Sequence, residues 1–199
     1  MTDNRSTVVV TGFGPFGIHL KNASWEAVKL LPSMHLEEEC NVRLITEEIP
    51  VTYDDVDTIV PQLWNKYQPL LMVHAGVSHI AKCLTLESCA NKSGYCKSDA
   101  KECILLNGIN SFGNEEHLKT KLDLNNISSE ASQFSVNLCI SDDASRYLCE
   151  YIYYTSLNIN TCNTIFVHVP MINAEYSASK IAEHLKLIIK LALKQLREL

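Results

Sequence analysis

Short stretches with the pattern of β-strands alternate along most of the chain with longer stretches of helical periodicity. Apolar, β-branched runs predict buried strands, and apolar residues three or four positions apart predict helices. The predicted strands cover residues 7–11, 42–49, 70–75, 82–89, 136–140 and 164–168. The predicted helices cover residues 24–31, 53–67, 149–158 and 177–199. This alternation indicates a mostly parallel sheet with helices on both faces, which is a three-layer α/β/α sandwich.

Two stretches fit this pattern less well. Residues 82–89 alternate between apolar and polar side chains, as an exposed or edge strand does. Residues 91–135 are polar and show no strong period, so no element is predicted there. The chain contains no internal repeat, and its 199 residues are enough to bury a substantial core. We therefore predict a single α/β domain over residues 1–199.

Charge and composition narrow the class of protein. The net charge of −6 is spread along the chain, which argues against a nucleic-acid partner. The first residues, MTDNRSTVVV, contain no long apolar segment, and no apolar run approaches the length of a transmembrane helix. We therefore expect a cytoplasmic protein without membrane association, in which all eight cysteines are thiols.

The helix at 149–158 and the strand at 164–168 bring a cysteine and a histidine to the same level. The helix spans roughly 14 Å at ~1.5 Å per residue, and the strand returns roughly 13–17 Å at ~3.3 Å per residue. His168 then lies beside Cys149, whose place at a helix N-terminus favours the thiolate. Each residue alone is more often a core side chain, but together they predict a nucleophile and its base.

A thiol–imidazole pair usually has a third group that orients the histidine. Glu87, Glu150 and Asp142 are candidates, and their spacing does not choose between them. Glu87 lies on the strand predicted at 82–89, and an acidic residue on an exposed strand is more often simply solvated. Residues 141–143 are polar residues of the type that starts helices. We therefore expect a helix to start there, just before the nucleophile.

Residues 12–17, GFGPFG, follow the first predicted strand and match the G-x-G-x-x-G pattern of dinucleotide-binding loops. Three features argue against that function. Pro15 lacks an N–H for a pyrophosphate, no helix starts at Gly17, and the acidic residues 37–39 precede the second strand. Phe13 and Phe16 better suit the walls of a slot for a small flat ring, with core filling as the plainer alternative.

A second group of cysteines lies at positions 83, 89, 96 and 103. Five or six residues separate each pair, whereas zinc sites typically use closer pairs with about two to four residues between them. The spacing therefore argues against a structural metal. A redox or metal-responsive role for these thiols remains an alternative.

Four motifs together resemble a known family. TGFGPFG near the N-terminus, NASW just after it, SRYLCEYIYY and FVHVP occur in the order typical of the pyroglutamyl-peptidase I family. The resemblance covers nearly the whole chain and is closest to the animal enzymes. This family of cysteine peptidases removes N-terminal pyroglutamate, or 5-oxoproline, from peptides. Its fold is a single α/β/α sandwich, in agreement with the pattern above.

The resemblance also implies roles for individual residues. Glu87 in LTLES, Cys149 in RYLCEY and His168 in FVHVP fall on the family's catalytic triad. The substrate ring would be bracketed by the two phenylalanines of the glycine loop, with the residues before the nucleophile nearby. The implied substrate-binding residues are Phe13, Phe16, Tyr147 and Leu148.

The implied reaction needs neither a metal ion nor an organic cofactor. Its expected partners are peptides with N-terminal pyroglutamate, acted on by a protein that we expect to be a monomer. The chain departs from the family pattern at Ser145, where glycine is usual, and at Ala100, where the family tends to have asparagine. Because both lie near the substrate side, the alternative is a weak or inactive relative that binds such peptides without cleaving them.

Overall fold

The computed structural model describes residues 4–17 and 21–198. Its centre is a six-stranded sheet in the order β2-β1-β3-β8-β4-β7. These strands are β1 (Ser6–Phe13), β2 (Val42–Ile49), β3 (Leu71–Val77), β4 (Leu84–Glu87), β7 (Leu138–Ser141) and β8 (Thr164–Val169). Neighbouring strands run parallel except β4 and β8, which are antiparallel. A second, antiparallel sheet pairs β5 (Cys89–Asn91) with β6 (His117–Lys119).

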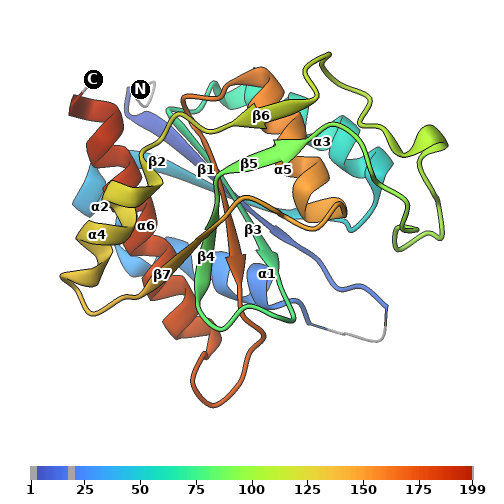
Figure 1. Ribbon diagram of the computed structural model, residues 1–199. Helices are drawn as coiled ribbons and strands as arrows, with labels where there is room; N and C mark the ends of the chain where they lie inside the picture. The colour runs from blue at the N-terminus through green and yellow to red at the C-terminus, as the bar shows by residue number, and fades with distance from the viewer. Residues whose placement is uncertain (1–3, 18–20, 199) are drawn as a thin grey trace.

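Helices cover both faces of the main sheet, as Figure 1 shows. One face packs against α1 (Ala23–Val28), α4 (Leu124–Ser132) and α6 (Ala178–Glu198), and the other against α3 (Tyr53–Tyr67) and α5 (Leu148–Ile159). The short helix α2 (Leu36–Cys40) and two 3₁₀ turns, Leu31–Met34 and Leu106–Gly108, complete the set. The predicted three-layer sandwich is therefore confirmed. Within the described residues, no helix has the length and apolar composition required to cross a membrane.

Side-chain alternation along the strands decides which residues face α5. In β8, Ile165 and Val167 point into the core beneath α1 and α6, so Phe166 and His168 point to the opposite face. In β4, Leu84 and Leu86 pack in the same hydrophobic core as α6. Glu87 therefore points to the opposite face, toward α5. The pattern of the two strands thus places Glu87 and His168 in one layer with α5.

Most predicted elements are present with small changes at their ends. The bounds predicted for β2 and α3 agree with the structure. Those for β8 differ by one residue at one end, and those for α5 by one residue at each end. Gly12 and Phe13 belong to β1 rather than to the loop after it. Helix α1 ends at Val28, before a 3₁₀ turn that contains Pro32. Of the predicted C-terminal helix, Leu199 lies outside the described residues.

The prediction that residues 82–89 form an exposed or edge strand is wrong. Strand β4 lies between β8 and β7, and the edge strands of the sheet are β2 and β7. The alternation is real, but Thr85 is half-buried, and Glu87 is buried on the face of the sheet toward α5 rather than exposed to solvent. A polar position in a strand does not reveal whether water or another side chain faces it.

The stretch for which nothing was predicted contains real elements. Besides β6, it holds α4, capped by Asp123, whose side chain accepts a 3.0 Å hydrogen bond from Asn126 N. Only Leu124, Ile127 and Ala131 of this helix are buried. Serine and asparagine fill its other face, which weakens the apolar period that would have revealed it. The residues at 141–143 also do not start a helix, because Ser141 ends β7 and α5 begins at Leu148.

The expectation of eight free thiols is also wrong. Cys83 and Cys139 form a disulfide, with their Cα atoms 6.6 Å apart. Cys139 lies on β7 opposite Thr85 of β4, so the pairing of these strands brings the two cysteines together although 56 positions separate them. The remaining six cysteines are free. Among the described residues, no group of three His, Cys, Asp or Glu side chains is arranged to hold a metal ion.

Candidate active site

The candidate site lies where β1, β3 and β8 end and α5 begins. Parallel strands bring their carboxyl ends to one edge of the sheet, where ligands commonly bind in open α/β folds. Gly76 of β3 is paired with His168 of β8 in the sheet register. Cys149 is the second residue of α5, whose N-terminus faces this edge. The structure therefore brings together the histidine and cysteine that the helix–strand spacing predicted to meet.

Glu87 and His168 form a buried hydrogen-bonded pair. The distance from His168 Nδ1 to Glu87 Oε1 is 2.7 Å, and the two residues are 6% and 2% exposed. Glu87 lies opposite Phe166, so it reaches His168 diagonally across the antiparallel ladder. The other two acidic candidates have different partners. Glu150 binds Arg146 and Asn91, and Asp142 accepts a hydrogen bond from Cys89 Sγ through its backbone carbonyl.

The charge state of His168 depends on both neighbours. Burial disfavours the imidazolium, but the charge of a Cys149 thiolate and hydrogen bonds to Cys149 and Glu87 favour it. These interactions outweigh burial, so the pKa of His168 is raised above its ordinary value. The arrangement supports an imidazolium at His168 beside Cys149, and an imidazolium can deliver a proton.

Gly76 provides the space for the thiol. A Cβ atom at this position would lie 2.6 Å from Cys149 Sγ and 2.8 Å from Cζ of Phe166. Both distances are shorter than van der Waals contact, so any side chain would displace the sulfur or the ring. In the sequence, Gly76 is only the residue that follows the strand predicted at 70–75. Its role depends on contacts with α5 and β8, which no local pattern shows.

A small cavity of about 90 Å³ lies next to Cys149, and we call it the slot. It is lined by Phe13, Phe16, Asn22, Val51, Val77, His79, Tyr147, Leu148 and Cys149. All four residues predicted to bind substrate are among them. The described residues that line the slot include aromatic and aliphatic side chains, one amide and one imidazole, but no carboxylate. Such a slot suits a flat, uncharged ring with a few polar atoms.

Local contacts fix the walls of the slot. Asn22 caps α1 by accepting a hydrogen bond from Ser24 N at 3.1 Å, and its amide donates to Gly14 O at 3.0 Å. The cap therefore ties the glycine loop to the helix. Tyr147 is held from the other side, because its hydroxyl donates to Ser98 O at 3.0 Å. Ala100 N donates to Val51 O at 2.9 Å, a backbone contact that does not depend on the side chain at position 100.

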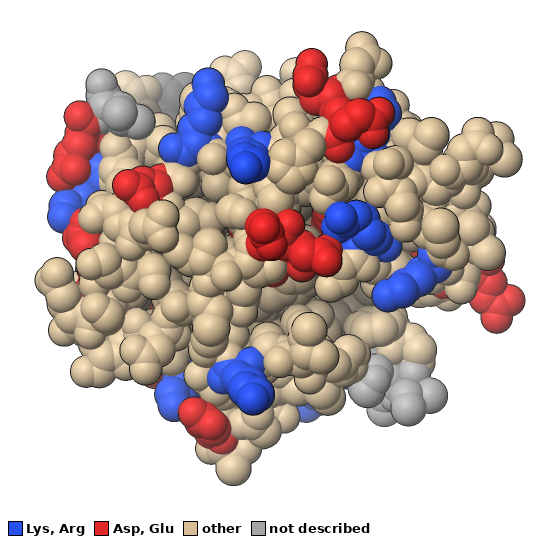
Figure 2. All heavy atoms as spheres, viewed as in Figure 1, with Lys and Arg blue, Asp and Glu red and all other residues tan. Residues whose placement is uncertain are grey.

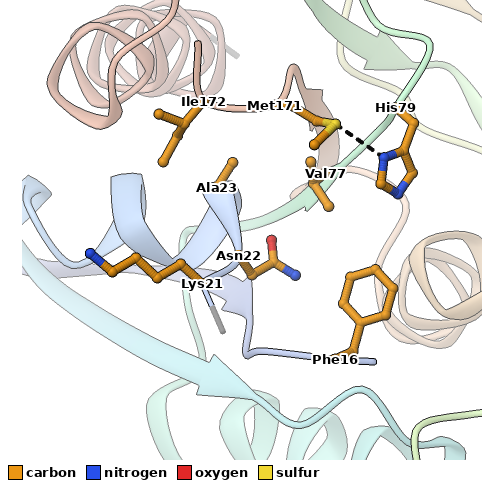
Figure 3. Close-up of a pocket in the computed structure, with 8 residues that line it drawn as sticks. All are labelled: Phe16, Lys21, Asn22, Ala23, Val77, His79, Met171 and Ile172. Carbon is orange, nitrogen blue, oxygen red and sulfur yellow. Dashed lines mark hydrogen bonds between the residues drawn. The ribbon is translucent and has the colours of Figure 1, made fainter. Parts of the chain in front are cut away.

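Two further cavities share lining residues with the slot. One, of about 230 Å³, shares Phe16, Asn22, Val77 and His79 with the slot and extends toward Met171 and Ile172 (Figure 3). The other, of about 270 Å³, is lined by both Cys149 and His168 and extends past Ser145, Ile80 and Lys97. We call it the exit cavity, since it leads away from the side of Cys149 that faces His168. No sequence pattern had indicated Val51, Val77 and His79, which come from strand ends and loops with no motif of their own.

An α/β sandwich that sets a thiol, an imidazole and a carboxylate side by side at the strand ends is the architecture of a cysteine-type hydrolase. The sequence model of the family described as pyroglutamyl peptidase, Peptidase_C15, matches residues 6–195. The chain therefore belongs to the pyroglutamyl peptidase family, whose members are cysteine-type peptidases.

Individual relatives agree with this assignment. The chain is 38% identical to pyroglutamyl-peptidase 1 of Homo sapiens over 198 residues, covering 96% of this chain and 91% of the relative. It is 30% identical to the human pyroglutamyl-peptidase 1-like protein over 160 residues, or 80% and 82% of the two chains. The crystal structure of pyroglutamyl peptidase I from Bacillus amyloliquefaciens superposes with a TM-score of 0.83 at 22% identity, covering 95% and 97% of the chains. That similarity shows the shared fold.

Proposed function

We propose that this protein hydrolyses the amide bond that follows an N-terminal pyroglutamate in peptides. Family membership supports the reaction, and one observation on the slot supports the substrate. An aminopeptidase that binds a free α-amino group needs an acidic anchor, and the slot beside Cys149 has none among the described residues that line it. Pyroglutamate has no charged amine, since its nitrogen is closed into a lactam. An aromatic-walled slot is therefore suited to this ring.

The three buried polar residues have separate roles in the proposed reaction. The Cys149 thiolate attacks the carbonyl carbon of the pyroglutamyl residue and forms a thioester as the C–N bond breaks. His168 donates its proton to the leaving amine, and then takes a proton from the water that hydrolyses the thioester. Glu87 holds Nδ1 of His168 at 2.7 Å, which fixes the tautomer and stabilises the imidazolium.

The tetrahedral intermediate carries a negative oxygen that needs hydrogen-bond donors. The first N–H groups of a helix have no intrahelical partner and point away from its N-terminus. Leu148 and Cys149 open α5, and we assign their N–H groups to this oxygen. The ring lies in the slot between Phe13, Phe16, Tyr147 and Leu148, and the departing peptide occupies the exit cavity.

We further propose that the protein acts as a cytoplasmic monomer without a cofactor. Cys149 must be reduced to act, and six of the eight cysteines are free thiols. The apolar face of α6 packs within the chain, where Ile181, Leu185 and Ile188 are fully buried, so it is not available to a second copy. On the face shown in Figure 2, acidic and basic side chains are interspersed rather than gathered in a basic patch.

The direct test is release of a fluorophore from a pyroglutamyl amide by the wild-type protein and by Cys149→Ser. We expect hydrolysis by the wild type alone, loss of activity on thiol alkylation, and no loss with EDTA. The prolyl amide, which has the same ring with a charged amine and no lactam carbonyl, should be a poor substrate. Binding of a pyroglutamyl peptide without product at high protein concentration would instead favour the inactive alternative.

A further inference from the structure

A fully buried carboxylate next to the nucleophile takes no part in the reaction proposed above. Glu150 follows Cys149 in α5 and has no exposed surface. Its Oε1 accepts hydrogen bonds from Asn91 N and Asn91 Nδ2, both at 2.8 Å. Its Oε2 accepts from Arg146 N at 2.6 Å and from an Arg146 guanidinium nitrogen at 2.8 Å. Both oxygens are therefore saturated, which suits a structural anchor rather than a proton carrier.

The segment that Glu150 binds has an unusual backbone. Ser145 and Arg146 have φ angles of +79° and +50°, the left-handed region that side chains other than glycine rarely adopt. Two consecutive residues of this kind cost free energy and persist only where neighbouring contacts hold them. Tyr147, the N-cap of α5, follows directly and has no side-chain cap hydrogen bond. The backbone conformation of the residues just before α5 therefore depends on contacts with side chains outside this segment.

Glu150 supplies those contacts. In a capping box, the third residue of a helix accepts a hydrogen bond from the N-cap N–H. Here the third residue of α5 reaches one position further back, to Arg146 N. The Arg146 guanidinium binds the same carboxylate and also lies 2.7 Å from Asp143 Oδ1. Its aliphatic stem packs against Gly94, where a Cβ would lie 3.2 Å from Arg146 Cδ.

We propose that Glu150 is a positioning residue that holds Ser145 and Arg146 in their left-handed conformation and so aligns Cys149 and the first N–H groups of α5. The proposal rests on the proposed function, since it assigns those groups to the reaction. Asn91 at the end of β5 ties the anchor to the second sheet. Arg146 balances the negative charge of Glu150. Without Arg146, that charge would oppose a thiolate on the neighbouring Cys149. No substrate contact is needed for this role.

Glu150→Gln tests the proposal, because the amide has nearly the same shape but one of its two terminal groups cannot accept a hydrogen bond. We expect kcat on the pyroglutamyl amide to fall by about 10–100-fold through misalignment, with KM changed by less than about threefold. Because a smaller folded fraction would also lower apparent kcat with KM unchanged, kcat is calculated per folded molecule, with the folded fraction measured by circular dichroism. Glu183→Gln, at an exposed glutamate of α6, is the matched control and should retain wild-type activity.

The decisive measurement is rescue by Ser145→Gly. Glycine adopts the left-handed conformation without strain, so it should reduce the need for the anchor. We expect Glu150→Gln to reduce kcat several-fold less in the Ser145→Gly background than in the wild type. Equal reductions in the two backgrounds, or a folded Glu150→Gln protein with wild-type kcat, would overturn the proposal.

Two further arms keep the test decisive. If Glu150→Gln does not fold, Asn91→Ala removes a single side-chain donor to Glu150 and should reduce kcat about threefold without changing KM. An unchanged kcat would contradict the proposal.

If the wild type does not hydrolyse the amide, the proposed function fails separately. The rate at which iodoacetamide alkylates Cys149, followed by peptide mass spectrometry, then reports the alignment, and equal rates in wild type and Glu150→Gln would reject it.

Discussion

Two buried histidines on neighbouring strands of this protein have opposite electrostatic environments. His74 of β3 is fully buried, and His168 of β8 is 6% exposed. The His74 ring lies between two hydroxyl groups, with Nδ1 2.7 Å from Thr11 Oγ1 and Nε2 2.6 Å from Ser156 Oγ. His168 lies between the Glu87 carboxylate and the Cys149 thiol. Similar burial therefore accompanies very different neighbours.

The comparison separates the effect of burial from the effect of charge. Burial alone lowers the pKa of His74 to about 3, so that this ring is neutral at physiological pH. The same penalty acts on His168, but the Cys149 thiolate and Glu87 reverse it and raise its pKa. A buried histidine therefore becomes a proton donor only where anionic partners meet it. The predictions below change one histidine or its partners at a time.

The largest difference is expected when each histidine is replaced in turn. His168→Gln should reduce kcat/KM by about 10³-fold or more, because the general acid and base is lost. His74→Gln should retain most of the activity per folded molecule, since His74 contacts neither the slot nor Cys149. The cooperative unfolding transition of each variant, followed by circular dichroism, provides the fraction of folded molecules. Comparable losses in both variants would remove the functional distinction between the two rings.

Removal of the carboxylate partner should make His168 resemble His74. Glu87→Gln is expected to lower kcat by about 10²–10³-fold and to lower the pKa of His168, since Glu87 raises it. The wild-type enzyme loses activity as pH rises through that raised pKa and the imidazolium is lost. The alkaline limb of the pH–rate profile should therefore move to lower pH in Glu87→Gln. Glu183→Gln is the control, and an unshifted limb in Glu87→Gln would show that the carboxylate does not tune the ring.

Gly76 lies two residues beyond His74 and opposite His168, and offers a steric test of the same region. Gly76→Ala places a methyl group within 2.6 Å of the position of Cys149 Sγ. We expect kcat to fall about 10–100-fold because the sulfur is displaced from its line of attack. The rate of Cys149 alkylation by iodoacetamide should change in parallel. A variant with normal kcat would mean that the thiol has room that the structure does not show.

The smallest effect concerns stability in acid. The unfolded state binds a proton at His74 with a pKa of about 6.5, whereas the folded state resists it to about pH 3. Stability from this group is therefore complete above pH 6.5 and is lost as pH falls, by about 2 kcal/mol at pH 5. His168 acts in the opposite direction, since its stabilisation is complete below pH 6.5 and declines as pH rises through the higher folded value.

Urea unfolding of wild type and His74→Gln at pH 5 and pH 7.5 isolates the contribution of His74 to the pH dependence of stability, because all other groups titrate alike in both proteins. The free energy of unfolding of the wild type should fall by about 2 kcal/mol more than that of the variant between pH 7.5 and pH 5. Identical changes in both proteins would show that His74 is not neutral in the folded state.

The two histidines also show how far the sequence leads. Both lie in apolar strand segments, MVHAG and FVHVP, so periodicity predicts that both are buried. The length match between α5 and β8 singled out His168, because that helix and strand are adjacent in sequence and their rise per residue is fixed. Spacing alone left Glu87, Glu150 and Asp142 open, and the choice of Glu87 came from the family resemblance.

What the sequence determined by itself is therefore local: which segments are strands and helices, the layered α/β class, and the meeting of Cys149 with His168. The tertiary structure alone decided that β4 is internal and antiparallel to β8, that Cys83 meets Cys139, and that Glu150 anchors the turn before the nucleophile. The physical reason is that helix and strand periods depend on neighbours a few residues away. Strand order, cross-strand partners and the charges around a buried ring depend on which distant segments pack together.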